Sequence, residues 1–82
     1  MIMMVTVLLF ASYADRLGAR QINVDLDTNA SVGDLVQRVR AFPGGSDLPD
    51  TPLVAVNERY AAMVHRLTAG DEVALIPPVA GG

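Results

Sequence analysis

The carboxyl end of the chain holds the residues whose types and order could carry chemistry. Gly81 and Gly82 follow the stretch Pro77-Pro78-Val79-Ala80, so the α-carboxylate of Gly82 stands at the tip. Each proline fixes φ at about −65° and lacks an N–H, which ends a strand and directs the chain outward in an extended form. Glycines have no Cβ, so the tip is slim enough for a narrow pocket on another protein. We interpret it as a carboxylate that other proteins grip, activate and attack.

The alternative interpretation is an inert chain end, because termini are commonly poorly ordered. A Gly-Gly pair preceded by a Pro-Pro stem favours the functional interpretation, since glycine makes up only about 7% of average sequences. An α-carboxylate is an anion at neutral pH and a poor electrophile, so its activation needs a leaving group supplied by another protein. The candidate reactive residues are therefore Gly82, which bears the carboxyl, and Gly81, which gives access to it.

The rest of the chain lacks the groups of a self-contained enzyme. It has no cysteine, which removes disulfides, thiolate nucleophiles and cysteine metal sites together. All six basic residues are arginine, so there is no lysine for a Schiff base, a phosphate loop or an isopeptide bond within the chain. The one histidine, His65, has no partner at a catalytic or metal-binding spacing, and we assign it no role. We expect no metal and no bound cofactor.

Composition limits the class of protein further. A chain of 82 residues with 51% hydrophobic content predicts one small globular domain. The net charge of −3 and the absence of a basic cluster argue against a nucleic-acid partner. No apolar run approaches the roughly 20 residues of a membrane span. The amino end has no basic segment typical of an export signal, so we expect a cytoplasmic protein.

Three strands and a short helical turn are predicted around this tip. Residues 3–10 are apolar except for Thr6, which predicts a central strand buried on both faces. Residues 11–18 predict a single helical turn that ends at Gly18. Residues 20–27 alternate apolar and polar side chains, as in a half-exposed edge strand. Residues 72–76 predict a last buried strand that leads directly into the tail.

A single main helix is predicted between the second and third strands. Ser31 and Asp34 have the spacing of a capping box, so the helix begins after Ser31. Arg38 and Arg40 lie on its polar side, where a solvated face is the simplest interpretation. The apolar positions have the i, i+3, i+4, i+7 spacing of a stripe that packs on a sheet: Val32, Leu35, Val36 and Val39.

The segments after the helix predict a loop and a hairpin. Residues 42–52 are rich in Pro, Gly and Asp without periodicity, which is typical of a long surface loop. Residues 53–56 predict a short strand, residues 57–59 a turn, and residues 60–64 a returning strand. The resulting order of strands and helix is typical of an α+β fold of the β-grasp type, with the first and last strands parallel in the centre. We expect the domain to span residues 1–76 and the extended tail residues 77–82.

Four segments resemble the small subunit of molybdopterin synthase, the MoaD-like and ThiS-like ubiquitin-related sulfur carriers. The resemblance covers nearly the whole chain, and its most specific part is Gly-Asp-Glu-Val over residues 70–73 followed by Pro-Pro-Val-Ala-Gly-Gly over residues 77–82. The other matches are residues 7–11, 31–35 and 54–57. One departure is Ala14-Asp15, where the family often has an Arg-Glu pair.

The resemblance implies a route for the carboxylate. An activating enzyme would consume ATP to adenylate Gly82, and a sulfurtransferase would supply sulfur to form a thiocarboxylate. The large subunit of molybdopterin synthase would then use that sulfur, so the chain would act within a hetero-oligomer as a sulfur carrier and not as the catalyst. The family's apolar contact patch falls on Phe10, Tyr60 and Ile76, and the tail residues Pro77, Pro78, Val79 and Ala80 would enter the partner. Large apolar residues also build cores, so burial has to decide between the two roles.

Three other functions stay open at this stage. Related carriers with a terminal Gly-Gly supply sulfur to thiazole or cysteine synthesis. A ubiquitin-like modifier would instead join its carboxyl to lysines of target proteins. The last alternative is a plain interaction module with an inert tail.

Overall fold

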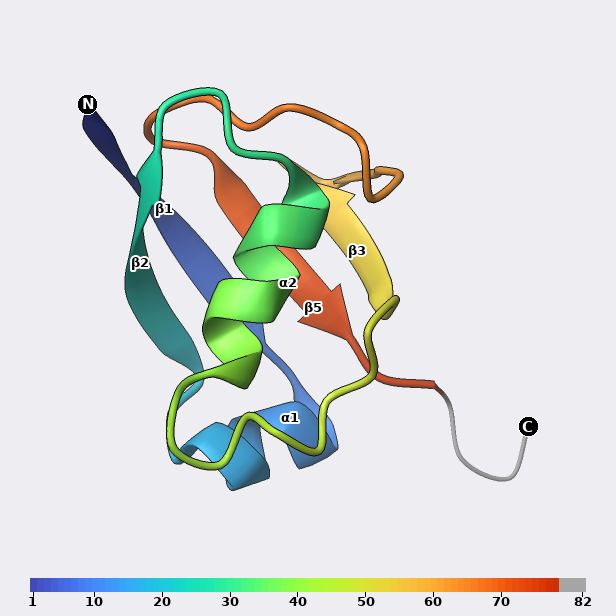
Figure 1. The fold of residues 1–82 in the computed structure, drawn as a ribbon. Coiled ribbons are helices and arrows are strands. Elements are labelled where there is room, and N and C mark those ends of the chain that lie inside the picture. Colours follow the sequence, from blue (N-terminus) through green and yellow to red (C-terminus); the bar gives the residue numbers. More distant parts are fainter. Residues whose placement is uncertain (79–82) are drawn as a thin grey trace.

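The computed structural model describes residues 1–78, which form one mixed sheet and two helices. The elements in chain order are β1 (Ile2–Leu9), α1 (Ala11–Leu17), β2 (Gln21–Asp27), α2 (Val32–Arg40), β3 (Leu53–Val56), β4 (Arg59–Tyr60) and β5 (Glu72–Ile76). The strands lie side by side in the order β2-β1-β5-β3-β4 (Figure 1). β1 and β5 are parallel, and the other neighbours are antiparallel. This is the predicted β-grasp arrangement, with first and last strands adjacent.

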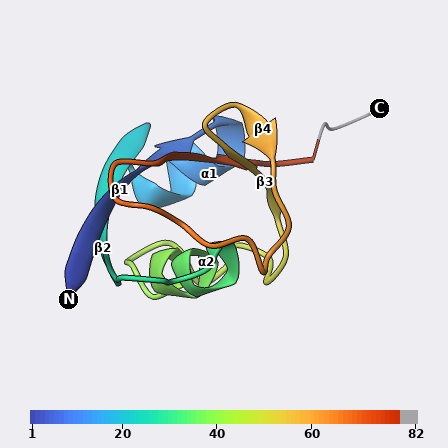
Figure 2. The ribbon, with the colours of Figure 1, turned by 90° about the horizontal axis from the view of Figure 1, so that it is seen from above.

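The core lies between α2 and one face of the sheet (Figure 2). The predicted capping box is present: Asp34 N–H donates to Ser31 Oγ at 3.2 Å, and Ser31 N–H donates to Asp34 Oδ2 at 2.9 Å. The predicted stripe of α2 is fully buried, and it packs with the inward side chains of four strands. Those strand residues are Met3, Val5, Val7, Leu9, Val24, Leu26, Val54, Val56, Val73 and Leu75.

β1 is buried on one face only, which corrects the prediction for residues 3–10. Its odd-numbered residues are in the core, whereas Met4 on the opposite face is 53% exposed. Thr6 and Leu8 on that face are half-buried. Burial on both faces was predicted because both faces of residues 3–10 carry apolar side chains, but α2 covers only one of these faces.

α1 closes the lower end of the core in Figure 1, and it confirms the predicted helical turn. Gly18 ends the helix with φ of 73°, and its N–H donates to the Ala14 carbonyl. Tyr13 is buried among core residues, and this burial raises the pKa of its hydroxyl. The neutral phenol is therefore the form that the fold favours.

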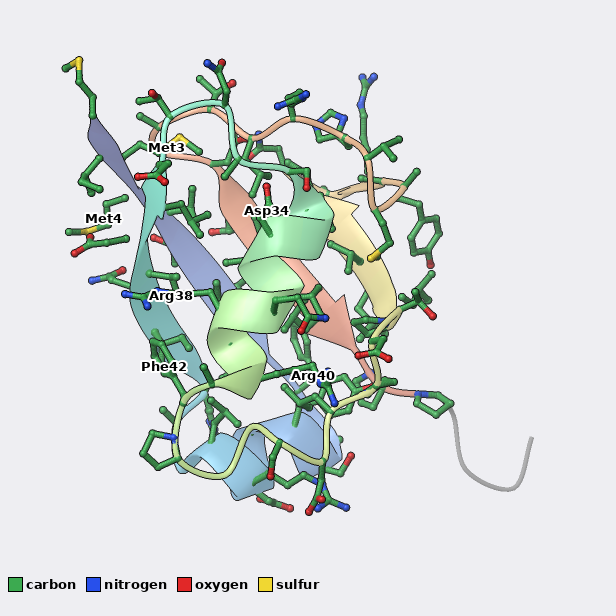
Figure 3. The ribbon with its side chains drawn as sticks, viewed as in Figure 1. Met3, Met4, Asp34, Arg38, Arg40 and Phe42 are labelled. Carbon is green, nitrogen blue, oxygen red and sulfur yellow. The ribbon has the colours of Figure 1, made fainter. Side chains whose placement is uncertain are left out.

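The loop of residues 42–52 is more firmly held than a surface loop. Leu48 is only 2% exposed and belongs to the core. Arg40 reaches from α2 into this loop (Figure 3), where its Nε donates to the Leu48 carbonyl at 2.8 Å and its Nη1 contacts the Asp50 carboxylate. Arg16 of α1 pairs with Asp47 at 2.8 Å. Arg40 is thus a structural clamp, and its prediction as part of a solvated face was wrong.

Gly44 and Gly45 are required by close backbone packing within the same loop. Gly44 has φ of 86°, and a Cβ there would overlap the carbonyl oxygen of Arg16. A Cβ on Gly45 would overlap the carbonyl oxygen of Val39. The two glycines therefore allow the loop to pack closely against the backbones of α1 and α2.

We expect Gly44→Ala to destabilise the fold far more than Gly70→Ala. Both glycines have φ of 86°, but the space around Gly70 is open. The left-handed backbone alone costs a non-glycine residue about 1 kcal/mol, and the backbone displacement at Gly44 adds about 2 kcal/mol. Urea unfolding of the two variants measures this difference, and equal midpoints would show that the loop does not pack as described.

β4 is much shorter than predicted, since residues 61–64 are not part of a strand. The turn before it places Asn57 and Glu58 at positive φ, 50° and 71°. Asn57 also fixes the beginning of β5, because its side chain donates to Asp71 at 3.0 Å and accepts from Glu72 N–H at 3.0 Å. The turn therefore aligns β3 with the strand that leads to the tail.

Candidate functional site

The sheet face opposite α2, here called the outer face, carries an apolar patch. Leu8, Ala74, Ala55 and Tyr60 form one row across four strands, because each is paired with the next in the register. Ile76 is paired with Leu53 in the neighbouring row. Phe10 follows β1 directly after Leu9, whose partner is Leu75, so it lies level with Ile76. The outer patch comprises Leu8, Phe10, Leu53, Ala55, Tyr60, Ala74 and Ile76.

Large side chains of this patch are open to solvent. Phe10 is 47% exposed, Tyr60 is 76% exposed and Ile76 is half-buried, so none of the three belongs to the buried core. Leu53, at 51% exposure, extends the same patch. Exposed apolar groups that gather on one face commonly mark a surface that binds another protein.

Sequence reasoning missed the patch residues Leu8, Leu53, Ala55 and Ala74. They are ordinary apolar strand residues, and only the strand order shows that they share a face with Tyr60. The sequence of β5 gave no signal, because its residues after Glu72 are all apolar, and only the structure shows that Val73 and Leu75 are buried while Ala74 and Ile76 are half-buried.

The stem of the tail emerges at the edge of the outer patch. β5 ends at Ile76, and Pro77 and Pro78 continue outside any strand at the end of the molecule where α1 lies (Figure 1). Pro77 is half-buried and Pro78 is exposed. The predicted site residues Val79, Ala80, Gly81 and Gly82 lie outside the described residues.

A shallow hollow adjoins the patch next to Phe10. It has a volume of about 500 Å³ and is lined by Leu8, Leu9, Phe10, Ala11, Ala14, Arg20 and Gln21. The hollow, the patch and the proline stem face the same end of the molecule. Together they form an apolar contact surface for a partner, beside the point where β5 ends.

The described residues hold no evident catalytic cluster. Over residues 1–78, no group of three or more His, Cys, Asp or Glu side chains is placed to hold a metal ion. His65 is exposed, and its contribution is a backbone carbonyl that accepts from Val32 N–H at 2.9 Å. Neither helix in this part of the chain is long and apolar enough to cross a membrane.

The fold, the patch and the tail stem agree with a family assignment from sequence. The model of the ThiS family matches residues 7–82, which is nearly the whole chain. The chain belongs to the ThiS family. It is accordingly a ubiquitin-like β-grasp protein of the ThiS/MoaD group, whose members are sulfur carriers or ubiquitin-like modifiers.

Two relatives and one further solved structure are similar to this chain. Small archaeal modifier protein 1 of Haloferax volcanii is 39% identical over 90% of this chain and 95% of the relative. Its crystal structure superposes with a TM-score of 0.83 over 96% of this chain and 99% of that one. The molybdopterin synthase sulfur carrier subunit of Dictyostelium discoideum is 32% identical over 93% of each chain. A complex of subunits 1 and 2 of the molybdopterin-converting factor of Helicobacter pylori contains a chain of the same fold, with a TM-score of 0.69 and 22% identity over 98% of this chain and 100% of that one.

Proposed function

We propose that this ThiS-family chain is the sulfur-carrying small subunit of a molybdopterin synthase. The carboxylate of Gly82 attacks the α-phosphorus of ATP and releases pyrophosphate. Sulfur at the sulfide level then attacks the carbonyl carbon of the acyl-adenylate and expels AMP, which leaves with the bridging oxygen. The resulting thiocarboxylate is the form that donates sulfur. Adenylation turns a carboxylate oxygen into part of a leaving group, which is what allows a sulfur nucleophile to attack the carbonyl carbon. Gly81 keeps the approach to that carbon narrow.

One observation carries this proposal: the exposed outer patch ends where the tail stem leaves β5. The patch gives a partner an apolar surface to bind, and Pro77 and Pro78 follow β5 beside it without continuing the strand. A docking surface beside the last strand suits a carrier whose reactive end works inside another protein's pocket. The 32% identity to the molybdopterin synthase sulfur carrier subunit of Dictyostelium discoideum supports this arrangement.

The proposal names three partners, each with its own task. The large subunit of the synthase binds the patch and receives the tail, an adenylating enzyme consumes ATP, and a sulfurtransferase delivers sulfur. The chain itself holds no cofactor, and its only modification is the thiocarboxylate. We place this exchange among cytoplasmic proteins.

The second candidate is a ubiquitin-like modifier. The specific observation that favours it is the 39% identity to a protein named small archaeal modifier protein 1. Here the activated Gly82 would be attacked by a lysine amine of a target protein instead of by sulfur. Both functions begin with the same adenylate, and they differ in the nucleophile that follows.

Reconstitution separates the two candidates. The purified chain is incubated with an activating enzyme, ATP and a sulfur donor, and then with a molybdopterin synthase large subunit and its precursor substrate. Formation of molybdopterin supports the proposal. Loading of the tail without molybdopterin, accompanied by covalent adducts on lysines of added proteins, would instead favour the modifier.

We expect Tyr60→Asp to weaken binding of the large subunit by about 2 kcal/mol, which is typical of a central aromatic contact. Tyr60 is 76% exposed, so the domain should unfold at nearly the same urea concentration as before. Val64→Asp is the matched control, because Val64 is 81% exposed but lies outside the patch. Calorimetric titration measures both variants, and equal affinities would place the partner elsewhere.

A further inference from the structure

The exposed edge of β2 offers unpaired backbone groups for an added strand. Leu9 N–H donates to the Arg20 carbonyl, and Thr28 N–H donates to the Met1 carbonyl. In an antiparallel pair such bonded residues alternate, so the even-numbered residues of β2 direct their backbone groups toward β1. The backbone N–H and C=O groups of the odd-numbered residues therefore point to the free edge, where no other strand of residues 1–78 lies. These residues include Gln21, Asn23 and Asp25.

A groove lies beside the C-terminal part of this edge, between residues 25–27 of β2 and α2. Its volume is about 780 Å³. One wall is the end of β2 with the turn that follows, residues 25–30. The other wall is a stripe of α2 formed by Asp34, Gln37 and Arg38, with Ala41 directly after the helix, and Ile2 and Arg66 complete the lining. Arg38 extends from α2 on the β2 side (Figure 3). Because Val24 and Leu26 face the core side of β2, a strand added here would place alternate side chains in this groove.

Several charged groups of the groove already have partners within the fold. Asp34 is held in the capping box by the Ser31 N–H. Arg66 donates from Nη1 to the Asn29 carbonyl at 2.6 Å. The long stem of Arg38 can cover apolar side chains while its guanidinium stays in water. The apolar part of the lining is Ile2, Leu26, Ala30 and Ala41, and apolar side chains of an added strand can pack beside these residues.

The other side of the edge is acidic. Asn23, Asp25 and Asp27 point to the outer face, and all three are exposed. Side chains directly opposite each other on neighbouring strands attract when their charges are opposite and repel when they are alike. Pairing β2 with β2 of a second copy would bring these carboxylates together. Repulsion between the carboxylates therefore disfavours self-association through β2. A strand with basic side chains opposite Asp25 and Asp27 is favoured instead.

We propose that the β2 edge and its groove form a binding site for an extended peptide segment that alternates basic and apolar residues. Its backbone continues the sheet beyond β2, its apolar side chains enter the groove, and its basic side chains lie beside Asp25 and Asp27. This site is on the opposite edge of the sheet from β4 and is separate from the outer patch.

The test uses the full chain labelled with ¹⁵N and a synthetic peptide that alternates lysine and valine, with blocked ends. We expect amide signals of β2 and of the α2 stripe to shift on titration. The edge amides of Asn23 and Asp25 should also gain protection from hydrogen exchange. A peptide with glutamate in place of lysine should bind at least about tenfold more weakly, since every cross-strand charge pair then repels.

Two controls separate strand addition from nonspecific attraction. Two lysine-valine peptides are methylated on alternate backbone nitrogens, one at the lysines and the other at the valines. Only the peptide whose free N–H groups face β2 should bind, because the other cannot donate to the edge. Asp25→Lys should weaken binding about fivefold, whereas Asp15→Lys on α1 should not. Binding of both methylated peptides with the affinity of the unmethylated one, equal effects of the two Asp variants, or shifts confined to the outer patch would overturn the proposal. Association of the chain with itself through β2 would also overturn it.

Discussion

A chain that ends at Gly81 is expected to lose adenylation and sulfur transfer almost completely while it still folds and binds its partner. No described core contact involves residues after Ile76, so the loss of Gly82 should leave the stability unchanged. The shortened tail keeps a terminal carboxylate, but its carbonyl carbon falls about 3.3 Å short of its place in the partner's site. A displacement of 1 Å can already lower a rate by about 10²-fold.

ATP-dependent adenylation, measured by pyrophosphate exchange with the activating enzyme, provides the readout for this deletion. A second variant carries one extra residue after Gly82, which moves the carboxylate about the same distance in the other direction. Both variants should fail, and both should bind the large subunit with nearly unchanged affinity. Normal thiocarboxylate formation by either variant would show that the tip does not work as proposed.

Leu35→Ala is expected to destabilise the domain by about 2–5 kcal/mol, a large part of the stability of a small protein. Leu35 is fully buried between α2 and the sheet, so its truncation leaves a cavity that the neighbouring strands cannot easily fill. The matched control is Leu53→Ala, since Leu53 is 51% exposed on the outer patch. That variant should lose less than about 1 kcal/mol.

Urea denaturation followed by circular dichroism measures both leucine variants. The two substitutions remove the same atoms, so the difference between them reports burial and not chemistry. A midpoint for Leu35→Ala close to that of the unaltered protein would contradict the packing of α2 on the sheet.

The parts of the fold that follow from local patterns were predictable from the sequence. α2 has a capping box and an apolar stripe, which together determine where it begins and which face is buried. β2 shows clean alternation, so its half-exposed edge position was also predicted correctly. Both signals arise from residues close together in the chain.

Features that depend on contacts between distant segments were not predictable in this way. Arg40 lies on the polar side of the helical pattern, yet it binds the Leu48 carbonyl and the Asp50 carboxylate of the following loop. Leu48 is a single apolar residue in a segment rich in Pro and Gly, and it carries no periodic signal. β1 has apolar residues on both faces, and only the position of α2 decides which face is covered.

The candidate site divides in a similar way. Phe10, Tyr60 and Ile76 were named from a family resemblance, and the strand order places them together on one face with Leu53. The resemblance could not say whether they were buried, because that depends on the absence of a helix from the outer face among the described residues. Their role in partner binding stays a prediction that Tyr60→Asp tests.

The most direct test of the sulfur-carrier proposal is intact-protein mass spectrometry of the chain isolated from cells that make molybdopterin. The proposal predicts a species heavier than the unmodified chain by the difference between one sulfur and one oxygen atom. Fragmentation should place that difference on Gly82, and the species should disappear when the activating enzyme is deleted. A chain found only as the free carboxylate, or only as much heavier conjugates with other proteins, would contradict the proposal.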